Sequence, residues 1–473
     1  MLQYLRVKSA PALVCTLAIA VFIALASAAR AGISDNVKTE TLPNGLKVLV
    51  LENHKAPVAT FHVFYKVGSR NEQTGKTGLA HLCEHLMFRG TKKYKPEEID
   101  KIIEENGGDL NAETSEDFTE YFENINRDHL DVPISMEADR MGDFDPQGFD
   151  SEKAVVMEER RMRTEDNPAD ALDELARAQA YIEHPYHWPT IGWMHDVEGL
   201  TLEDARAFHE MYYSPQNALI VAVGDFDADK VMKQISEQFG SIKNGPKPPP
   251  FNQIEPPQQG ERRVILRHAA NLPSFEESFH VPNLKSPDAY ALEVLSEVLA
   301  DGKSSRLYKD LVIDKRMVVG TSAGSNMTSF DPPLFTFSAQ MRPGVKTDDV
   351  LAEVDRQIKL LRDQPVSEAE LQKAKNLEQA EFVYGQDSIF NEASELGVYE
   401  MLGDYKLIDQ YLPAIDKVSV ADIQRVAQKY LVKDNRTVAI LEPTGLLPKQ
   451  AGGGPSGGTL HRSISVFDEG GVR

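Results

Sequence analysis

The sequence has 473 residues, of which 41% are hydrophobic and 26% are charged, as in ordinary globular proteins. This composition excludes a disordered chain, a collagen-like fibre and a protein with many membrane spans. Acidic residues outnumber basic ones by 73 to 51, and the net charge of −22 opposes binding to the phosphate backbone of nucleic acids. The two cysteines, Cys15 and Cys83, exclude a disulfide scaffold and a cysteine-rich metal site.

Residues 1–31 are typical of a targeting segment. Arg6 and Lys8 precede an uncharged, Ala-rich run that ends in small residues, as in a secretory signal peptide. We therefore expect cleavage and export, with the periplasm as the expected compartment. The alternative is an uncleaved membrane anchor at residues 9–29, which are long enough to cross a hydrocarbon core of about 30 Å. Cleavage would also remove Cys15, so the exported chain could form no internal disulfide.

A Pro-rich stretch at residues 244–261 divides the chain and predicts a semi-rigid linker. It separates two halves, residues 35–243 and 262–445, each long enough to form a core of its own. Both halves show the same order of strand-like runs and helical stretches and close on a strand-like run. This order predicts an α+β protein with two homologous tandem domains, each a mostly antiparallel sheet with helices packed on it. Residues 446–473, in which the run AGGGPSGG begins at Ala451, are expected to form a flexible tail.

The most informative motif is His81-Leu82-Cys83-Glu84-His85, an H-x-x-E-H pattern in a predicted helix. At about 100° per residue, His81, Glu84 and His85 share one helix face, whereas Cys83 points away and is expected to be a small buried hydrophobe. Two histidines four residues apart can bind one zinc ion. Glu84 could then reach a water molecule at the metal and act as a general base. The alternative is a chance pair of histidines on a solvated helix.

A catalytic zinc ion needs a third protein ligand, and the best candidates lie in residues 149–168. Glu152 and Glu159 are seven residues apart and project from one helix face. Glu159 could bind the metal while Glu152 accepts a hydrogen bond from a ligating histidine. Glu158 is the rival for the ligand role, and a solvated acidic face is the alternative for most acids in this segment.

The chain resembles the inverzincins of the pitrilysin/insulinase family, above all the short bacterial members related to the mitochondrial processing peptidases. The resemblance covers residues 35–445 and rests on motifs in the family's order: GSRNE, GLAHLCEH, GGDLNAETSEDFTEYF, SEKAVVMEERRM, HPYHWPTIG, YYSPQNALIVAVGD and GKSSRLYKDL. In this resemblance the family's ligand glutamate falls on Glu159, 74 positions after His85, and its helper glutamate falls on Glu152.

The resemblance implies a zinc-dependent endopeptidase that acts on peptides held in a chamber between domains. We expect one zinc ion per chain, because the second half has no H-x-x-E-H motif, and a homodimer or a heterodimer with a related chain. Asn111 and Ala112 fall on the family's substrate-edge strand; a plain hairpin is the alternative. Arg306 and Tyr308 could face the substrate from the second domain, or Arg306 could form an ordinary surface ion pair.

Two other functions stay open at this point. The chain could be a non-catalytic partner that supplies a peptide-binding chamber, although such family members typically lose the zinc motif. It could hold a closed structural zinc site, but no fourth ligand is evident. His184, His187 and His195 lie among prolines that break helical spacing, so structural roles are expected for them.

Overall fold

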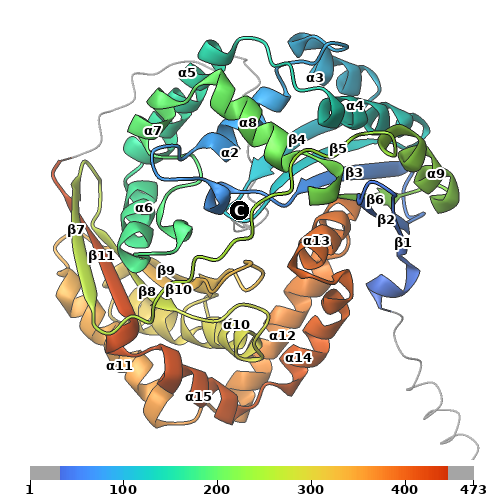
Figure 1. Ribbon diagram of the computed structural model, residues 1–473. Helices are drawn as coiled ribbons and strands as arrows, with labels where there is room; N and C mark the ends of the chain where they lie inside the picture. The colour runs from blue at the N-terminus through green and yellow to red at the C-terminus, as the bar shows by residue number, and fades with distance from the viewer. Residues whose placement is uncertain (1–31, 446–473) are drawn as a thin grey trace, which may run out of the picture.

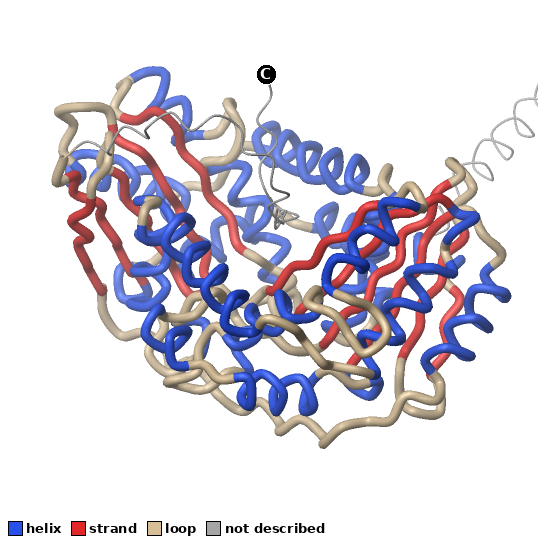
Figure 2. Tube along the Cα trace, turned by 90° about the horizontal axis from the view of Figure 1, so that it is seen from above, coloured by secondary structure: helices blue, strands red, loops and turns tan. Residues whose placement is uncertain are grey.

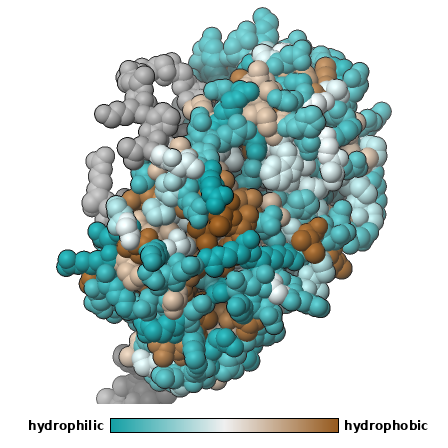
Figure 3. Space-filling model, turned by 90° about the vertical axis from the view of Figure 1, so that its left-hand side faces the viewer, coloured by the Kyte–Doolittle hydropathy of each residue, from teal (hydrophilic) through white to brown (hydrophobic). Residues whose placement is uncertain are grey.

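The computed structural model describes residues 32–445. The segment predicted to be a signal peptide or anchor and the tail at 446–473 lie outside these residues, so neither prediction is tested. No helix within residues 32–445 is long and apolar enough to cross a membrane. The surface on the side of the second domain's outer strands is mostly hydrophilic, with apolar side chains gathered in a few patches (Figure 3).

The first sheet has six strands in the order β1-β2-β6-β3-β5-β4. The β2 and β6 strands are parallel to each other, and every other neighbouring pair is antiparallel. The strands are β1 (Lys38–Thr41), β2 (Lys47–Glu52), β3 (Val58–Tyr65), β4 (Asp109–Thr114), β5 (Thr119–Asn126) and β6 (Ala218–Gly224).

The second sheet has five strands in the order β7-β11-β8-β10-β9, with β7 and β11 as its parallel pair. They are β7 (Arg262–His268), β8 (Ser274–His280), β9 (Val318–Ser325), β10 (Leu334–Met341) and β11 (Arg436–Pro443). Apart from β1, the two sheets correspond strand for strand. In the first sheet the closing strand β6 lies between β2 and β3, and in the second the closing strand β11 lies between β7 and β8. The prediction of two homologous α+β domains with mostly antiparallel sheets is confirmed.

Helices cover both sheets, which lie on opposite sides of the molecule (Figures 1 and 2). The first half contributes α2 (Leu79–Met87), α3 (Pro96–Glu105), α4 (Asp131–Gly142), α5 (Phe149–Arg160), α6 (Pro168–Ala180), α7 (Met194–Gly199), α8 (Leu202–Tyr212) and α9 (Ala228–Phe239). The second contributes α10 (Asp288–Leu299), α11 (Thr347–Asp363), α12 (Glu368–Gly385), α13 (Ile389–Leu402), α14 (Tyr411–Lys417) and α15 (Val420–Tyr430).

Each domain lends one helix to the sheet of the other. Helix α6 packs on β7, β8 and β11, and helix α13 packs on β3 and β6 (Figure 1). Alternate residues of β2, β3 and β6 therefore face two different cores, one inside the first domain and one against α13. Gly397 permits this packing, since a Cβ atom there would lie 2.2 Å from the ring of Phe64. The exchange makes the two domains one packing unit.

Candidate metal centre

Helix α2 carries the H-x-x-E-H motif, and a buried carboxylate fixes its first turn. Gly78 precedes the helix with a φ of 85°, in the left-handed region that favours glycine, and has no side chain to cap it. Glu72 fills that role: its carboxylate accepts hydrogen bonds from the N–H groups of Gly78 at 2.9 Å and Ala80 at 2.7 Å. These are donors that a helix start otherwise leaves unpaired. Leu82, Cys83 and Leu86 on the other faces are fully buried, as predicted for Cys83.

The structure brings His81, His85 and Glu159 together where α2 packs against α5. One ligand atom from each lies within 4.8 Å of the others. The Oε2 atom of Glu159 is 3.3 Å from Nε2 of His85 and 3.8 Å from Nε2 of His81. Glu158 instead points into solvent, with 62% of its side chain exposed, and pairs with Arg161. Of the two glutamates considered for the third ligand, the geometry therefore selects Glu159.

Glu152 orients the ring of His85. Its Oε1 atom lies 3.0 Å from Nδ1 of His85, and its Oε2 atom forms an ion pair with Arg89, 2.8 Å from Nε. A proton on Nδ1 that is donated to Glu152 leaves Nε2 of the same ring as a metal ligand facing Glu159. This is the hydrogen bond anticipated for Glu152 from the helix spacing.

Two of the three side chains, His81 and Glu159, have protonation states that suit a bound cation, whereas His85 must first lose a proton. Burial lowers the pKa of His81 to about 3, so this imidazole is neutral and able to bind a metal. Burial alone would raise the pKa of Glu159, but His85, His81 and Arg163 outweigh it and hold the pKa at about 2. Burial alone would lower the pKa of His85, but Glu152 and Glu159 raise it to about 10. A cation that binds His85 must therefore displace its proton.

Glu84 lies on the same helix as the two histidines and touches the edge strand β4. Its carboxyl group is buried, which raises its pKa, and it accepts a hydrogen bond from the hydroxyl of Thr114 at the end of β4. A carboxylate whose pKa is raised toward neutrality is suited to proton transfer. The sequence analysis missed Thr114, because only the tertiary contact of α2 with β4 reveals its role.

Two imidazole nitrogens and one carboxylate oxygen form a donor set that catalytic zinc sites use, with a coordination position left for water or substrate. The residues therefore fit zinc. Within residues 32–445, no other group of three or more His, Cys, Asp or Glu side chains has this spacing. A closed structural site would need a fourth ligand, which the described residues do not place there.

Comparison with known proteins identifies the family. Residues 47–192 match the model described as insulinase (peptidase family M16), and residues 199–378 match the model described as the peptidase M16 inactive domain. The chain belongs to peptidase family M16. It is 37% identical to zinc protease PqqE of Helicobacter pylori over 85% of this chain and 92% of that protein. It is also 28% identical to an uncharacterized zinc protease of Mycobacterium leprae over 89% of this chain and 96% of that protein.

Solved M16 structures show the same fold. The crystal structure of a protease from Helicobacter pylori matches with a TM-score of 0.83 and 35% identity over 86% of this chain and 99% of that chain. The periplasmic protease PqqL of Escherichia coli matches with a TM-score of 0.72 and 16% identity over 86% of this chain and 48% of that chain, a likeness of fold alone. In this M16 chain, the half that carries the zinc-binding motif matches the insulinase model.

Asn111 and Ala112 lie on β4, the outermost strand of the first sheet. Among the described strands, β4 pairs only with β5, in a register that places Asn111 opposite Phe122 and Ala112 opposite Tyr121. The side chain of Ala112 is buried, so this residue can contribute only backbone groups to a ligand at the edge. An edge strand of this kind can pair with an extended peptide.

The remaining candidates lie apart from the metal ligands. Arg306 makes two hydrogen bonds of 2.7 Å with Glu370 on α12, which is the ordinary ion pair kept as its alternative. His184 is buried near Asp331, His187 bonds to the carbonyl of His184, and His195 is exposed. None of these histidines joins the group around Glu159.

Proposed function

We propose that this chain is a zinc-dependent endopeptidase that hydrolyses peptides and small unfolded polypeptides. One observation carries the proposal: His81, His85 and Glu159 converge while Glu84, on the same helix, touches the open edge strand β4. A metal-binding group, a general base and a peptide-binding edge thus meet in one place. The names of the relatives, which include several zinc proteases, support the same conclusion.

Bound zinc would supply a Lewis acid that polarises the scissile carbonyl and lowers the pKa of a water molecule. Glu84 would accept a proton from the attacking water and then donate it to the nitrogen of the leaving amine. Thr114 holds the carboxylate of Glu84 in place for both transfers. Glu152 keeps His85 in the orientation that presents Nε2 to the metal.

The β4 edge would hold the substrate through main-chain hydrogen bonds. Because such pairing depends little on side chains, the strand could bind many extended peptides, which is consistent with broad specificity. We further propose that the working enzyme is a homodimer or a heterodimer with a related chain. We also propose that residues 1–31 direct export to the periplasm, with a membrane anchor at residues 9–29 as the alternative.

The alternative is a non-catalytic peptide-binding subunit. It differs in a measurable way, because such a chain can keep its metal without turning over peptides. Metal removal and replacement test the main proposal: purified protein should contain one zinc ion per chain, lose peptide hydrolysis after chelation, and regain it with stoichiometric zinc. Hydrolysis that persists in zinc-free protein would contradict the proposal.

A further inference from the structure

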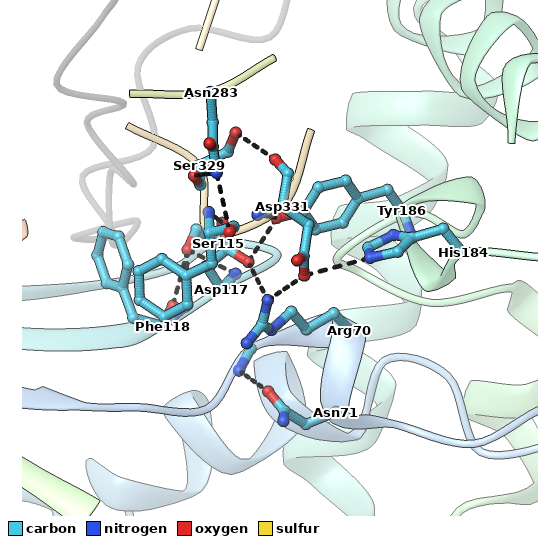
Figure 4. Close-up of polar contacts among 12 residues, drawn as sticks. Arg70, Asn71, Ser115, Asp117, Phe118, His184, Tyr186, Asn283, Ser329 and Asp331 are labelled. Atoms are coloured by element: carbon cyan, nitrogen blue, oxygen red, sulfur yellow. Dashed lines mark hydrogen bonds and ion pairs between the residues drawn. The ribbon is translucent and has the colours of Figure 1, made fainter. Parts of the chain in front are cut away.

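Arg70 lies where the two domains and the linker meet (Figure 4). Its Nη1 atom bonds to Asp331 of the second domain and is 3.4 Å from Oδ1 of Asp117 of the first. Its guanidinium also stacks on the ring of Phe330 at 4.9 Å and on the linker ring of Phe251 at 4.4 Å. With only 10% of its side chain exposed, Arg70 is a largely buried cation at this junction.

The two carboxylates that face Arg70 are themselves held by neighbours (Figure 4). Asp117 accepts from the hydroxyl of Tyr186 at 2.6 Å and from the N–H of Phe330 at 2.9 Å. The carboxylate of Asp331 lies 3.3 Å from Nε2 of His184, and its backbone N–H donates to the hydroxyl of Tyr186 at 3.2 Å. Asp117 lies in the turn between β4 and β5, and Asp331 in the corresponding loop between β9 and β10. The network therefore joins equivalent hairpins of the two domains.

The backbone around Arg70 reaches the edge strand of the proposed site. The N–H of Ser69 donates to the carbonyl of Ser115 at 3.1 Å, and the N–H of Arg70 donates to the carbonyl of Glu116 at 3.0 Å. This turn begins directly after Thr114, the residue that bonds to Glu84. A shift of the 115–118 turn would therefore also move the end of β4.

The same segment also reaches the metal-binding helix. Two residues after Arg70, Glu72 accepts the N–H groups of Gly78 and Ala80 in the first turn of α2. His81 is the next residue along that turn. Segment 69–72 is therefore bonded on one side to the turn that follows β4 and on the other to the start of α2.

We infer that Arg70 is a positioning residue: by anchoring segment 69–72 to Asp331 of the second domain, it sets the placement of helix α2 against strand β4. The inference rests on the proposed peptidase function for its effect on turnover. Through this link, the second domain would influence the geometry of the proposed metal site without contributing a ligand to it. A misplacement of about 1 Å at a reacting centre is enough to lower turnover about 100-fold.

The test compares Arg70→Ala and Asp331→Asn with Arg263→Ala. Arg263 forms an exposed ion pair with Asp348 on the second domain, so it is a matched control for loss of an arginine outside the junction. We expect Arg70→Ala and Asp331→Asn to keep one zinc ion per chain, to lower kcat about 10- to 100-fold, and to change KM much less. The double variant should lose little more than Arg70→Ala alone, because that change already removes the link to Asp331. Arg263→Ala should match the wild type.

Hydrogen exchange supplies a readout that does not require turnover. Amides of residues 79–87 and 109–119 should exchange faster in Arg70→Ala than in the wild type, whereas those of α11 should not change. If the wild type fails to hydrolyse peptides, the proposed function fails, and the exchange pattern still tests the role of Arg70. Unchanged kcat and unchanged exchange in a folded, zinc-loaded Arg70→Ala variant would overturn the inference. Should that variant not fold, the same two results in Asp331→Asn decide the matter.

Discussion

The hydroxyl of Thr114, at the end of edge strand β4, donates a hydrogen bond to the carboxylate of Glu84 on helix α2. This bond joins the strand that would hold a peptide to the group that would move the proton. It also lowers the pKa of Glu84, which burial alone raises. The relationship makes Thr114 a sensitive point for the proposed chemistry.

Replacing Thr114 with Val should lower kcat about 10- to 100-fold without loss of zinc, since a single hydrogen bond to a charged group contributes about 1.5–3 kcal/mol. Because the lost bond had lowered the pKa of Glu84, this pKa should rise. The acidic limb of the pH profile of kcat/KM should therefore move to higher pH. Thr114→Ser keeps the hydroxyl and should behave like the wild type; a profile that Val leaves unmoved would refute the role of this bond.

Replacing Glu152 with Ala should weaken zinc binding about 10- to 100-fold, as expected when the partner of a ligating histidine is lost. The physical reason is that Nδ1 of His85 loses the acceptor that orients its ring. Competition with a chromogenic chelator measures the effect. Glu158→Gln serves as the matched control, because this nearby side chain is exposed and pairs only with Arg161. Equal zinc affinity in the Glu152→Ala variant and the control would show that the hydrogen bond does not support the metal.

Zinc binding near pH 7 should release about one proton per chain. His85 has a pKa raised to about 10 by Glu152 and Glu159 and is therefore charged at neutral pH, whereas His81, with a pKa of about 3, is not. Zinc affinity should accordingly increase as the pH rises toward 10. Calorimetry in buffers of different ionisation enthalpy counts the protons. A heat of binding that is the same in all buffers would contradict this protonation of His85.

Gly397→Ala should destabilise the protein by about 1–3 kcal/mol, because the added methyl group would overlap the ring of Phe64 and push α13 away from β3. Urea denaturation with a folded-state signal from each domain measures the effect. Gly385→Ala is the matched control: a Cβ atom there meets nothing closer than 3.6 Å. Since each domain lends a helix to the other, both signals should change together, and separate transitions would argue against one packing unit.

Much of the fold follows from patterns that are local in the sequence. Alternating and continuous apolar runs mark β2, β3 and β6, and the repeated order of elements predicts the duplication. The exchange of α6 and α13 could not be predicted, because apolar periodicity shows that a helix is buried but not which sheet it covers. Only the folded chain shows that α13 reaches the first sheet.

The residues of the candidate site likewise fall into those that local sequence patterns predict and those that only the folded structure reveals. Helix spacing is enough to place His81, Glu84 and His85 on one face, and the motif order of the family indicates Glu159 rather than Glu158. Contacts between residues far apart in the sequence carry no such signal. Thr114 with Glu84, Arg306 with Glu370, and Arg70 with Asp331 are 30, 64 and 261 positions apart.

The most direct test of the central claim is hydrolysis of a mixed set of unfolded peptides by the purified chain, with Glu84→Gln beside it and the zinc content of both determined. The account predicts cleavage by the wild type, one zinc ion in each protein, and loss of nearly all turnover in Glu84→Gln, because this change removes the base and no ligand. Equal cleavage by the two proteins would contradict the role of Glu84. Absence of cleavage by the zinc-loaded wild type would contradict a self-sufficient peptidase and favour the partner-dependent or non-catalytic alternative.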